Sequence, residues 1–411
     1  MRVLVRRSRV SGRIRAPQSK SYAIRLVFAS LLADIALEDL VMSGDVLDAI
    51  DAVRIFGVEF DGARLRRPES IAIRGNRVFI RGSATVLRML IPIAAVVGGR
   101  IEIDGSENIR RRPIKAVVDA LRSRGVRFSR DSLPTVMEGR LADNYVEISG
   151  AESSQYISGF MVAFALAGGG TIDIVPPTVS REYIRLTADV LSRLGVRVVF
   201  SGRRIDVEVA EKPRGYSGKV PGDFLLASFY VASALLTGGS IEVYNLASFS
   251  GGPHRVVEIY REMGARSSFE KGVWRAEASD SYRGIAVDAV DDPDLVPSIV
   301  PLAAIAKGTT VVRGVSNLRI KESDRVESIV STLRSFGLDA RAPRGEALYI
   351  VGGEPSEARA VCPNDHRIAM MFTSIAVRSG GILDKAECVD KSNPGFWSDM
   401  RFLGADIRMD G

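Results

Sequence analysis

The chain has 411 residues, of which 46% are hydrophobic and 26% charged, and its formal net charge at pH 7 is +7. The longest apolar runs are too short to span a bilayer and no apolar segment follows the arginines of residues 2–9, so we expect a cytoplasmic globular protein with two or three cores. The positive charge fits nucleic acid or small anions equally, but the basic residues form no tract and aromatic residues are only 7%, which argues against an RNA-binding protein.

The first distinctive stretch is residues 17–25, which read P-Q-S-K-S-Y-A-I-R. Lys20 and Arg25 flank an expected helix start. Nine of the 56 basic residues are lysine and the other 47 are arginine. A lysine retained in so arginine-rich a chain suggests a position that needs a compact point charge.

One pattern then recurs along the whole chain: an amphipathic helix, a glycine and a short strand. The glycines are spaced by 67 to 73 residues, and each fits the left-handed position after a helix: Gly57, Gly125, Gly195, Gly264, Gly337 and Gly404. Between these units lies a small-residue apolar helix followed by a glycine turn and a strand, as in residues 93–105. A period near 70 residues predicts six βαβαββ units, which would pack as two groups of three around buried helices. Prolines and glycines of residues 213–222 predict a hinge between two lobes with a cleft.

Several polar motifs follow these elements in chain order. They are the loop Gly82–Arg88, Arg112-Pro113-Ile114, Ser153-Ser154-Gln155 at the start of an apolar helix, Ser180-Arg181-Glu182-Tyr183, and Pro293-Asp294. Taken singly, each has an ordinary structural interpretation as a helix cap, a turn or a surface loop.

Residues 317–325 read N-L-R-I-K-E-S-D-R, and apolar residues behind them recur at helical spacing until Gly337. This predicts an amphipathic helix over residues 326–336. Arg319, Lys321 and Arg325 then lie near its N-terminus, where the helix dipole is already positive. A bound anion would explain them, and so would a solvated turn with Lys321–Asp324 or Glu322–Arg325 pairs.

Two further motifs lie near the C-terminus, Asp365-His366-Arg367 and Lys391-Ser392. The two cysteines, Cys362 and Cys388, lack metal-ligand spacing. One disulfide is possible but not implied, and we expect two buried thiols. His254 falls on no motif, and we expect it to be structural.

Together, the repeats and motifs resemble the 5-enolpyruvylshikimate-3-phosphate synthase family of enolpyruvyl transferases. The resemblance covers the whole chain and implies an α/β (α+β) fold, a two-domain inside-out α/β barrel with three repeats per domain. It implies an N-terminal lobe over 14–221 and a C-terminal lobe over 1–13 and 222–411. The implied reaction belongs to the shikimate pathway of aromatic amino acid (chorismate) biosynthesis. It transfers the enolpyruvyl group of phosphoenolpyruvate to the 5-hydroxyl of shikimate 3-phosphate and releases phosphate through a tetrahedral intermediate.

The resemblance also implies the site residues. Asp294 would be the base, Glu322 the acid, and Lys321 would share the proton traffic. Shikimate 3-phosphate would contact Lys20, Ser21, Arg25, Ser153, Ser154, Gln155, Ser180, Tyr183, Asp294, Asn317 and Lys321. Phosphoenolpyruvate would contact Lys20, Arg88, Arg112, Gln155, Arg325, His366, Arg367 and Lys391. We expect no cofactor or metal, no nucleic-acid or membrane partner, a monomer, and closure of the lobes on the substrates.

The chain departs from the family pattern at three places: Ala23-Ile24, Gly82 with Ala84, and Gly251-Gly252-Pro253. In this family a methyl group at the position of Ala84 crowds the inhibitor glyphosate, so we expect weak inhibition. The rival is the related UDP-N-acetylglucosamine enolpyruvyl transferase. That family has Lys-Asn where this chain has Lys20-Ser21, and a reactive cysteine in the loop that here spans 104–112 without one.

Overall fold

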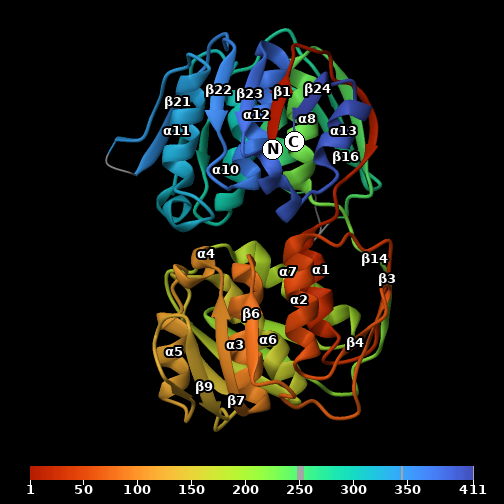
Figure 1. Ribbon diagram of the computed structural model, residues 1–411, viewed down its shortest axis with the longest axis vertical. Helices are drawn as coiled ribbons and strands as arrows, with labels where there is room; N and C mark the ends of the chain where they lie inside the picture. The colour runs from red at the N-terminus through yellow and green to blue at the C-terminus, as the bar shows by residue number, and fades with distance from the viewer. Residues whose placement is uncertain (248–253, 344–345, 411) are drawn as a thin grey trace. The chain divides into compact units, whose positions relative to one another are not determined.

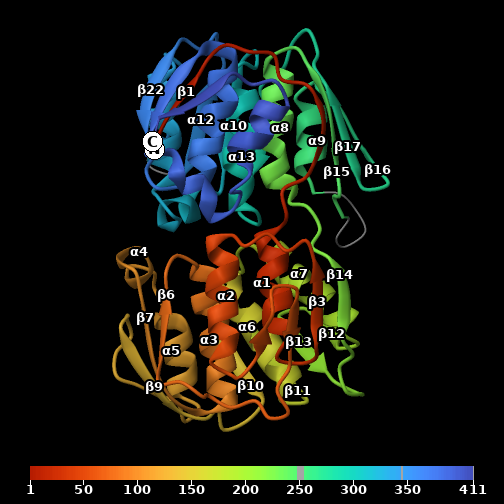
Figure 2. The ribbon, with the colours of Figure 1, turned by 45° about the vertical axis from the view of Figure 1, so that its right-hand side comes forward.

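The structure, a computed structural model, describes residues 1–247, 254–343 and 346–410. The chain forms two compact units. We call Lys20–Val220 the middle unit, and Met1–Ser19 with Pro221–Gly411 the terminal unit. The described residues of each unit form three four-stranded sheets (Figures 1 and 2).

The middle unit consists of three repeats. Its sheets have the strand orders β14(Tyr216–Lys219)-β3(Ile35–Glu38)-β5(Arg64–Arg66)-β4(Glu59–Phe60), β6(Arg77–Ile80)-β7(Gly99–Gly105)-β9(Thr135–Gly139)-β8(Arg127–Phe128) and β10(Tyr145–Ser149)-β11(Gly169–Val175)-β13(Arg204–Glu208)-β12(Arg197–Ser201). Its helices are α1 (Lys20–Ala29), α2 (Gly44–Arg54), α3 (Ala84–Val97), α4 (Glu107–Arg110), α5 (Lys115–Arg122), α6 (Ser154–Leu166) and α7 (Arg181–Arg193).

The terminal unit repeats this plan. Its sheets have the orders β22(Ala358–Val361)-β23(Gly381–Asp384)-β1(Arg2–Val5)-β24(Ile407–Asp410), β16(Arg266–Glu270)-β17(Val273–Glu277)-β15(Ser240–Tyr244)-β2(Gly12–Arg15) and β18(Ala286–Asp288)-β19(Thr309–Arg313)-β21(Ala347–Val351)-β20(Ala340–Arg341). Its helices are α8 (Phe224–Leu236), α9 (Val256–Glu262), α10 (Val296–Ala303), α11 (Arg325–Ser335), α12 (His366–Ser379) and α13 (Phe396–Phe402). Short 3₁₀ helices cover η1 (Pro293–Leu295), η2 (Ser316–Ile320) and η4 (Ala386–Lys391).

The small-residue apolar helices form the centre of each unit. Every residue of α8 is buried, and α10 and α12 pack against it and against each other. In the middle unit α3 packs on α6 in the same way. A helix that is hydrophobic all round must be covered on all sides, and the sheets and amphipathic helices do this in Figure 2. The predicted inside-out α/β fold of six repeats is therefore confirmed.

The six glycines that mark the period end their helices as predicted. All have positive φ angles, from +78° at Gly337 to +107° at Gly264. Residues with a Cβ atom avoid this left-handed conformation, so the glycines stop the helix and turn the chain toward the next strand. The helix predicted over 326–336 is α11, which begins one residue earlier, at Arg325.

Three strands complete repeats that lie far away in sequence. The N-terminal strand β1 pairs with β23 and β24, β2 pairs with β15, and β14 returns to pair with β3. Because β2 belongs to a sheet of the terminal unit, the first crossing between units falls after Ser19, not after residue 13 as the resemblance implied. The second crossing falls after Val220, one residue before the position expected.

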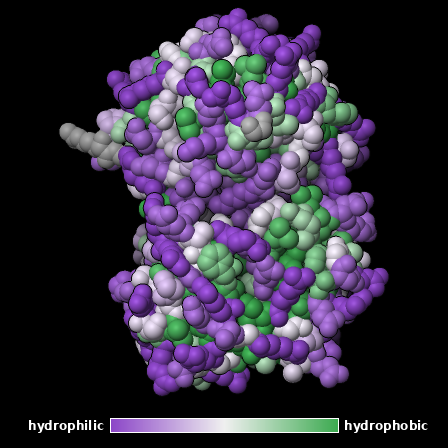
Figure 3. Space-filling view, in the orientation of Figure 1, coloured by the Kyte–Doolittle hydropathy of each residue, from purple (hydrophilic) through white to green (hydrophobic). Residues whose placement is uncertain are grey.

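Hydrophilic residues cover much of the face drawn in Figure 3. On the outer faces of the sheets, arginines pair with carboxylates of neighbouring strands, as Arg204 does with Asp173 at 2.8 Å and Arg197 with Glu208 at 3.0 Å. Cross-strand pairs of opposite charge support a sheet. No helix within the described ranges is long and apolar enough to cross a membrane.

Candidate functional site

The predicted motifs gather at the N-termini of helices. Lys20 begins α1, and the residues that precede α3, α6, α7, α11 and α12 are Ser83, Ser153, Ser180, Asp324 and Asp365. The first N–H groups of a helix have no partner within it, and the helix dipole is positive at that end. Each unit therefore presents several helix ends that favour anions.

In the middle unit, Arg88 joins two of the motifs. Its Nη1 donates to Ser153 Oγ at 3.3 Å and to Gln155 Oε1 at 3.2 Å. The Gln155 amide in turn donates to Thr85 Oγ1 at 2.7 Å. Arg88 is only 7% exposed, and its Nε has no hydrogen-bond partner among the described residues. A buried guanidinium with a donor to spare is suited to binding an oxyanion.

Ser153 also caps α6, because its Oγ accepts the N–H of Gln155 at 3.2 Å. Ser153 is therefore a helix cap, which is the ordinary structural interpretation of this motif. A capping serine can also take part in a binding site. The cap fixes Ser154, which is 2% exposed, at the first position of the helix.

Asp48, which the sequence analysis did not identify, holds the loop that carries Gly82 and Ala84. It lies on α2, is 1% exposed, and accepts the backbone N–H groups of Arg81, Gly82 and Ser83 at 3.1, 2.8 and 2.9 Å. Three hydrogen bonds to one carboxylate fix the path of the chain into α3.

Arg25 lies beneath the residues expected to bind shikimate 3-phosphate. It is 1% exposed and donates to Ser21 O, Thr187 Oγ1, Ser158 Oγ and Tyr183 O at 2.7 to 3.2 Å. These bonds use four of the five N–H groups of the guanidinium. Burial lowers the pKa of Arg25 to about 10, so it stays charged at neutral pH. Its main contribution is to tie α1, α6 and α7 together.

Lys20 and Arg112 lie in two other parts of the middle unit. The Lys20 ammonium pairs with the buried carboxylate of Asp45 at 2.8 Å. Arg112 is 7% exposed in the turn after α4. The Tyr156 hydroxyl donates to the carbonyl oxygen of Pro113 at 2.7 Å and so ties this turn to α6.

Ser180 has a left-handed backbone with φ +54° and makes no side-chain cap hydrogen bond to α7. This conformation is unfavourable for a residue other than glycine and occurs often at functional sites. The carbonyl oxygen of Ser180 accepts the N–H of Tyr183 at 3.1 Å.

In the terminal unit, Arg325 is the centre of an ionic network. Its guanidinium is 1% exposed and binds Asp294 Oδ1 at 2.6 Å, Asp365 Oδ2 at 2.7 Å and Glu322 Oε2 at 2.8 Å. Burial alone would lower the pKa of Arg325, but these three carboxylates raise it well above its usual value. The network joins three motifs that lie far apart in sequence.

Two lysines extend this network. Lys321 Nζ lies 3.5 Å from Asp294 Oδ1, and Lys391 Nζ lies 3.4 Å from Glu322 Oε1. Burial by itself raises the pKa of Asp294, but Lys321, Arg367 and Arg325 outweigh it and hold the pKa well below its usual range. Asp294 is therefore an ionised hydrogen-bond acceptor at neutral pH.

The solvated-turn interpretation of residues 317–325 is only partly correct, and anion binding there stays a prediction. Arg319 forms an exposed pair with Asp324 at 2.7 Å, as a solvated turn would, and the Glu322–Arg325 pair exists. Lys321, however, pairs with Asp294 of another motif. Asn317, on η2, shares no hydrogen bond with the network within the described part of the chain.

Asp365 organises the D-H-R motif. It caps α12 by accepting the N–H of Arg367 at 3.1 Å, and it also accepts the Ser323 hydroxyl at 3.2 Å. His366 and Arg367, which are 1% and 3% exposed, thus start α12 beside Arg325.

His254, which belongs to none of the motifs, pairs with Asp292 at 2.7 Å. Gly251-Gly252-Pro253 lies outside the described residues.

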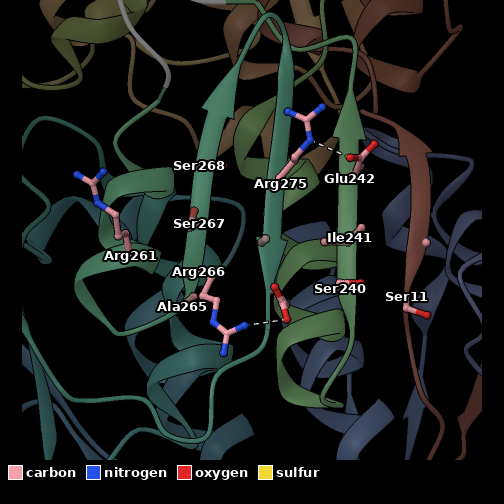
Figure 4. Close-up of a pocket in the computed structure, with 13 residues that line it drawn as sticks. Ser11, Ser240, Ile241, Glu242, Arg261, Ala265, Arg266, Ser267, Ser268 and Arg275 are labelled. Carbon is pink, nitrogen blue, oxygen red and sulfur yellow. Dashed lines mark hydrogen bonds and ion pairs between the residues drawn. The ribbon is translucent and has the colours of Figure 1, made fainter.

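A pocket of about 700 Å³ lies elsewhere in the terminal unit, against the sheet that contains β15, β16 and β17 (Figure 4). The residues that line it include none of the described motif residues. Four of its charged side chains form two pairs, Arg275 with Glu242 at 2.8 Å and Arg266 with Glu277 at 2.9 Å. These are ordinary ion pairs between neighbouring strands, and they do not form a set of hydrogen-bond donors directed at one ligand.

Comparison with known proteins agrees with the motifs. The family model for EPSP synthase (3-phosphoshikimate 1-carboxyvinyltransferase) matches residues 5–400. The 3-phosphoshikimate 1-carboxyvinyltransferase of Saccharolobus islandicus is 45% identical over 409 residues, which cover 98% of both chains. That of Sulfurisphaera tokodaii is 44% identical over 411 residues, which cover 99% of both. The solved structure of EPSP synthase from Acinetobacter baumannii has a TM-score of 0.82 at 21% identity, covering 99% of this chain and 100% of that chain, and so shares the fold.

Proposed function

The chain belongs to the EPSP synthase (3-phosphoshikimate 1-carboxyvinyltransferase) family, and we propose that its motif residues perform enolpyruvyl transfer as follows. The enolpyruvyl group of phosphoenolpyruvate passes to the 5-hydroxyl of shikimate 3-phosphate, and phosphate leaves. The observation that carries the assignment of residues is the network around Arg325, in which three motifs contribute carboxylates to one buried guanidinium. Such a network pre-arranges charge for substrates that are themselves anions.

Shikimate 3-phosphate is bound mainly by hydroxyl and amide groups of the middle unit. Hydroxyls at helix N-termini suit a phosphate because they donate hydrogen bonds without adding bulk. Ser153, Ser154 and Ser180 lie at such positions. The full set is Lys20, Ser21, Arg25, Ser153, Ser154, Gln155, Ser180 and Tyr183, with Asp294, Asn317 and Lys321 of the terminal unit.

Phosphoenolpyruvate is bound by cations. Its carboxylate and phosphate call for planar, multiply donating arginines and for compact lysines. The buried Arg88 of the middle unit and Arg367 of the terminal unit support this. The full set is Lys20, Arg88, Arg112, Gln155, Arg325, His366, Arg367 and Lys391.

The proton transfers fall to the carboxylates of the Arg325 network. Addition needs a base for the attacking hydroxyl and an acid for the methylene carbon. Asp294 is the base, and Lys321 lies close enough to pass on the proton. Glu322 is the acid, because Arg325 and Lys391 fix its two oxygens separately and Lys391 can supply its proton. In elimination, the Glu322 carboxylate takes a proton back from the methyl group and the carbon–oxygen bond to phosphate breaks. The proton held by Asp294 passes through Lys321 to the departing phosphate.

We also propose that glyphosate inhibits this enzyme weakly. Ala84 is the first residue of α3, next to the loop that Asp48 holds. Its methyl group adds bulk where the longer inhibitor needs room. Inhibition by micromolar glyphosate at low phosphoenolpyruvate would contradict this, and Ala84→Gly should increase sensitivity.

We further propose that the protein works as a monomer in the cytoplasm, because each unit buries its own helices and the substrates are metabolic intermediates. Light scattering after gel filtration would test the monomer, and fractionation of the source cells would test the location.

The experiment that tests the function is phosphate release on mixing the protein with phosphoenolpyruvate and either shikimate 3-phosphate or UDP-N-acetylglucosamine. Release only with shikimate 3-phosphate is expected. Release only with the sugar nucleotide would move the assignment to the related family. No release with either acceptor, at several temperatures, would overturn it.

A further inference from the structure

The two cysteines of the chain touch each other in the terminal unit. Cys362 follows β22 and Cys388 lies in η4, 26 residues later, and their sulfur atoms are 2.6 Å apart. Nonbonded heavy atoms in a protein interior are usually about 3.5–4.0 Å apart at closest packing. The side chains are 4% and 8% exposed and are free thiols. The sequence predicts two buried thiols, and nothing in it indicates that they touch.

The backbone fixes this proximity. Strands β22 and β23 pair in parallel, with Val361 opposite Asp384, and the N–H of Cys362 donates to the carbonyl oxygen of Asp384 at 2.8 Å. The 3₁₀ helix η4 follows β23 directly and returns Cys388 to the same place. The backbone thus brings the two cysteines to the same end of this sheet.

We propose that Cys362 and Cys388 form a disulfide in the native protein, and that this bond holds two segments of the Arg325 network at a fixed separation. Asp365 follows Cys362 by three residues and binds Arg325. Lys391 follows Cys388 by three residues and pairs with Glu322. Each cysteine therefore lies three residues before a charged side chain of the network, Asp365 beside Arg325 and Lys391 beside Glu322.

The oxidation balances with a peroxide or a small-molecule disulfide as oxidant. The thiolate of one cysteine attacks the oxidant, the second sulfur displaces the leaving group, and the S–S bond forms. The two thiols lose two protons and two electrons. Hydrogen peroxide is reduced to two waters, or a small disulfide to two small thiols.

The contact between the two thiols affects the pKa of each. The hydrogen bond from Cys388 lowers the pKa of the Cys362 thiol, and the N–H groups of Asp365 and Asn364 lower it further against the opposing effect of burial. The pKa of Cys388 is raised.

The first test is chemical and is independent of the proposed function. The full chain is purified without reductant, unfolded in the presence of an alkylating agent, digested and analysed by mass spectrometry. A cross-linked peptide pair containing both cysteines and lighter by two hydrogens is expected. Two alkylated cysteines, in protein as purified and after treatment with hydrogen peroxide, would overturn the proposal.

The second test concerns the role of the bond and rests on the proposed function. Reduction should lower the melting temperature by about 5–10 °C, because a cross-link over a loop of this length restricts the unfolded chain. It should also raise KM for phosphoenolpyruvate several-fold and leave KM for shikimate 3-phosphate unchanged. The double variant C362A/C388A should be insensitive to reductant. If the variant does not fold, reduced and oxidised wild-type protein still provide the comparison.

The outcomes are distinguishable. A cross-linked peptide with no phosphate release from any acceptor would leave the disulfide standing and overturn the function. A cross-linked peptide with equal KM values before and after reduction would overturn the positioning role.

Discussion

Single residues in the terminal unit are arranged around one buried guanidinium. The Arg325 guanidinium pairs with the carboxylates of Asp294, Glu322 and Asp365, and Lys321 and Lys391 add two further cations to the network. If one of these carboxylates is removed, Arg325 still has two partners. The effect of each substitution on activity or stability therefore depends on the other contacts and the proposed role of that carboxylate. Two predictions follow from this difference.

Glu322→Gln should abolish most activity and leave the fold intact. The amide keeps the shape and can still accept from Arg325, but it cannot give up a proton, so we expect kcat to fall by about 10²–10⁴-fold. Binding of shikimate 3-phosphate, measured by calorimetry, should change little. Glu327→Gln is the matched control, because Glu327 is an exposed acid in the first turn of α11, five residues after Glu322. Equal loss in both variants would contradict the role of Glu322.

Asp294 should make stability depend on pH in one direction. Its pKa in the folded protein lies below the ordinary value of 3.8, so its ionic contribution is present above about pH 3.8 and is lost as pH falls through the folded value. Asp294→Asn should be less stable by about 2 kcal/mol at neutral pH. In urea titrations the gap from wild type should stay constant from about pH 5 to 7 and shrink below about pH 3.8. The exposed Asp280→Asn should show no gap, and a gap that widens in acid would exclude this account.

Helix N-termini and the loops before them carry many residues of the proposed site. In the middle unit, the carboxylate of Asp48 sets the path of the loop into α3 through three backbone hydrogen bonds. A loop fixed in this way needs no further ordering when substrate arrives, and such pre-organisation favours binding.

Asp48→Asn should weaken binding of phosphoenolpyruvate specifically. The asparagine side chain has one acceptor oxygen, whereas the loop donates to both oxygens of the Asp48 carboxylate. The NH₂ group that replaces the second oxygen would face a backbone N–H. We expect KM for phosphoenolpyruvate to rise by about 10–100-fold, with KM for shikimate 3-phosphate nearly unchanged. Asp51→Asn, half-exposed on the same helix, is the control. A parallel rise in both KM values would indicate general distortion instead.

The glycines after the helices should contribute to stability only through their left-handed backbone conformation. Gly195 has φ +87°, and a Cβ atom there would meet only the flexible Arg214 side chain, at 3.5 Å. Gly195→Ala should therefore cost about 1–2 kcal/mol and lower the melting temperature by about 2–6 °C. Gly75→Ala, with ordinary φ and no atom within 4 Å, should be neutral. Similar melting temperatures for the two variants would contradict the role of backbone conformation.

The helix–glycine–strand period was visible in sequence because helical spacing and a left-handed glycine are local requirements. The membership of β2 in a sheet of the terminal unit could not be predicted from the sequence, because a strand of four residues does not reveal which strand it pairs with. Asp48 was missed for a similar reason. Its only signal is an acid among the apolar positions of α2, and the backbone groups that it holds lie 33 to 35 residues away. Lys321 could be assigned to the site from its motif, but its pairing with Asp294 could not.

At the scale of the whole molecule, the two units differ in how much of the chain each requires. The middle unit is continuous, whereas the terminal unit needs residues from both ends. Strand β1 lies between β23 and β24, so β24 loses its partner without it.

A fragment of residues 20–220 should fold alone, and a fragment of residues 221–411 should not. We expect a cooperative melt by circular dichroism for the first and none for the second. Attaching residues 1–19 after the C-terminus through a flexible linker should restore the second melt. Neither fragment should release phosphate, because each lacks part of the binding set. A cooperative melt of 221–411 alone would show that β1 and β2 are dispensable.

The pairing of β1 with β24 also means that the two ends of the chain are neighbours. Arg2 lies opposite Asp410 in an antiparallel ladder, which is the arrangement of a hairpin whose turn has been cut. The terminal unit therefore has a sheet in which both ends of the chain take part, and a covalent link between them would add only a turn. Joining the ends by a short turn and opening the chain at the exposed turn around Gly202, between β12 and β13, would give a circular permutant with the same sheets.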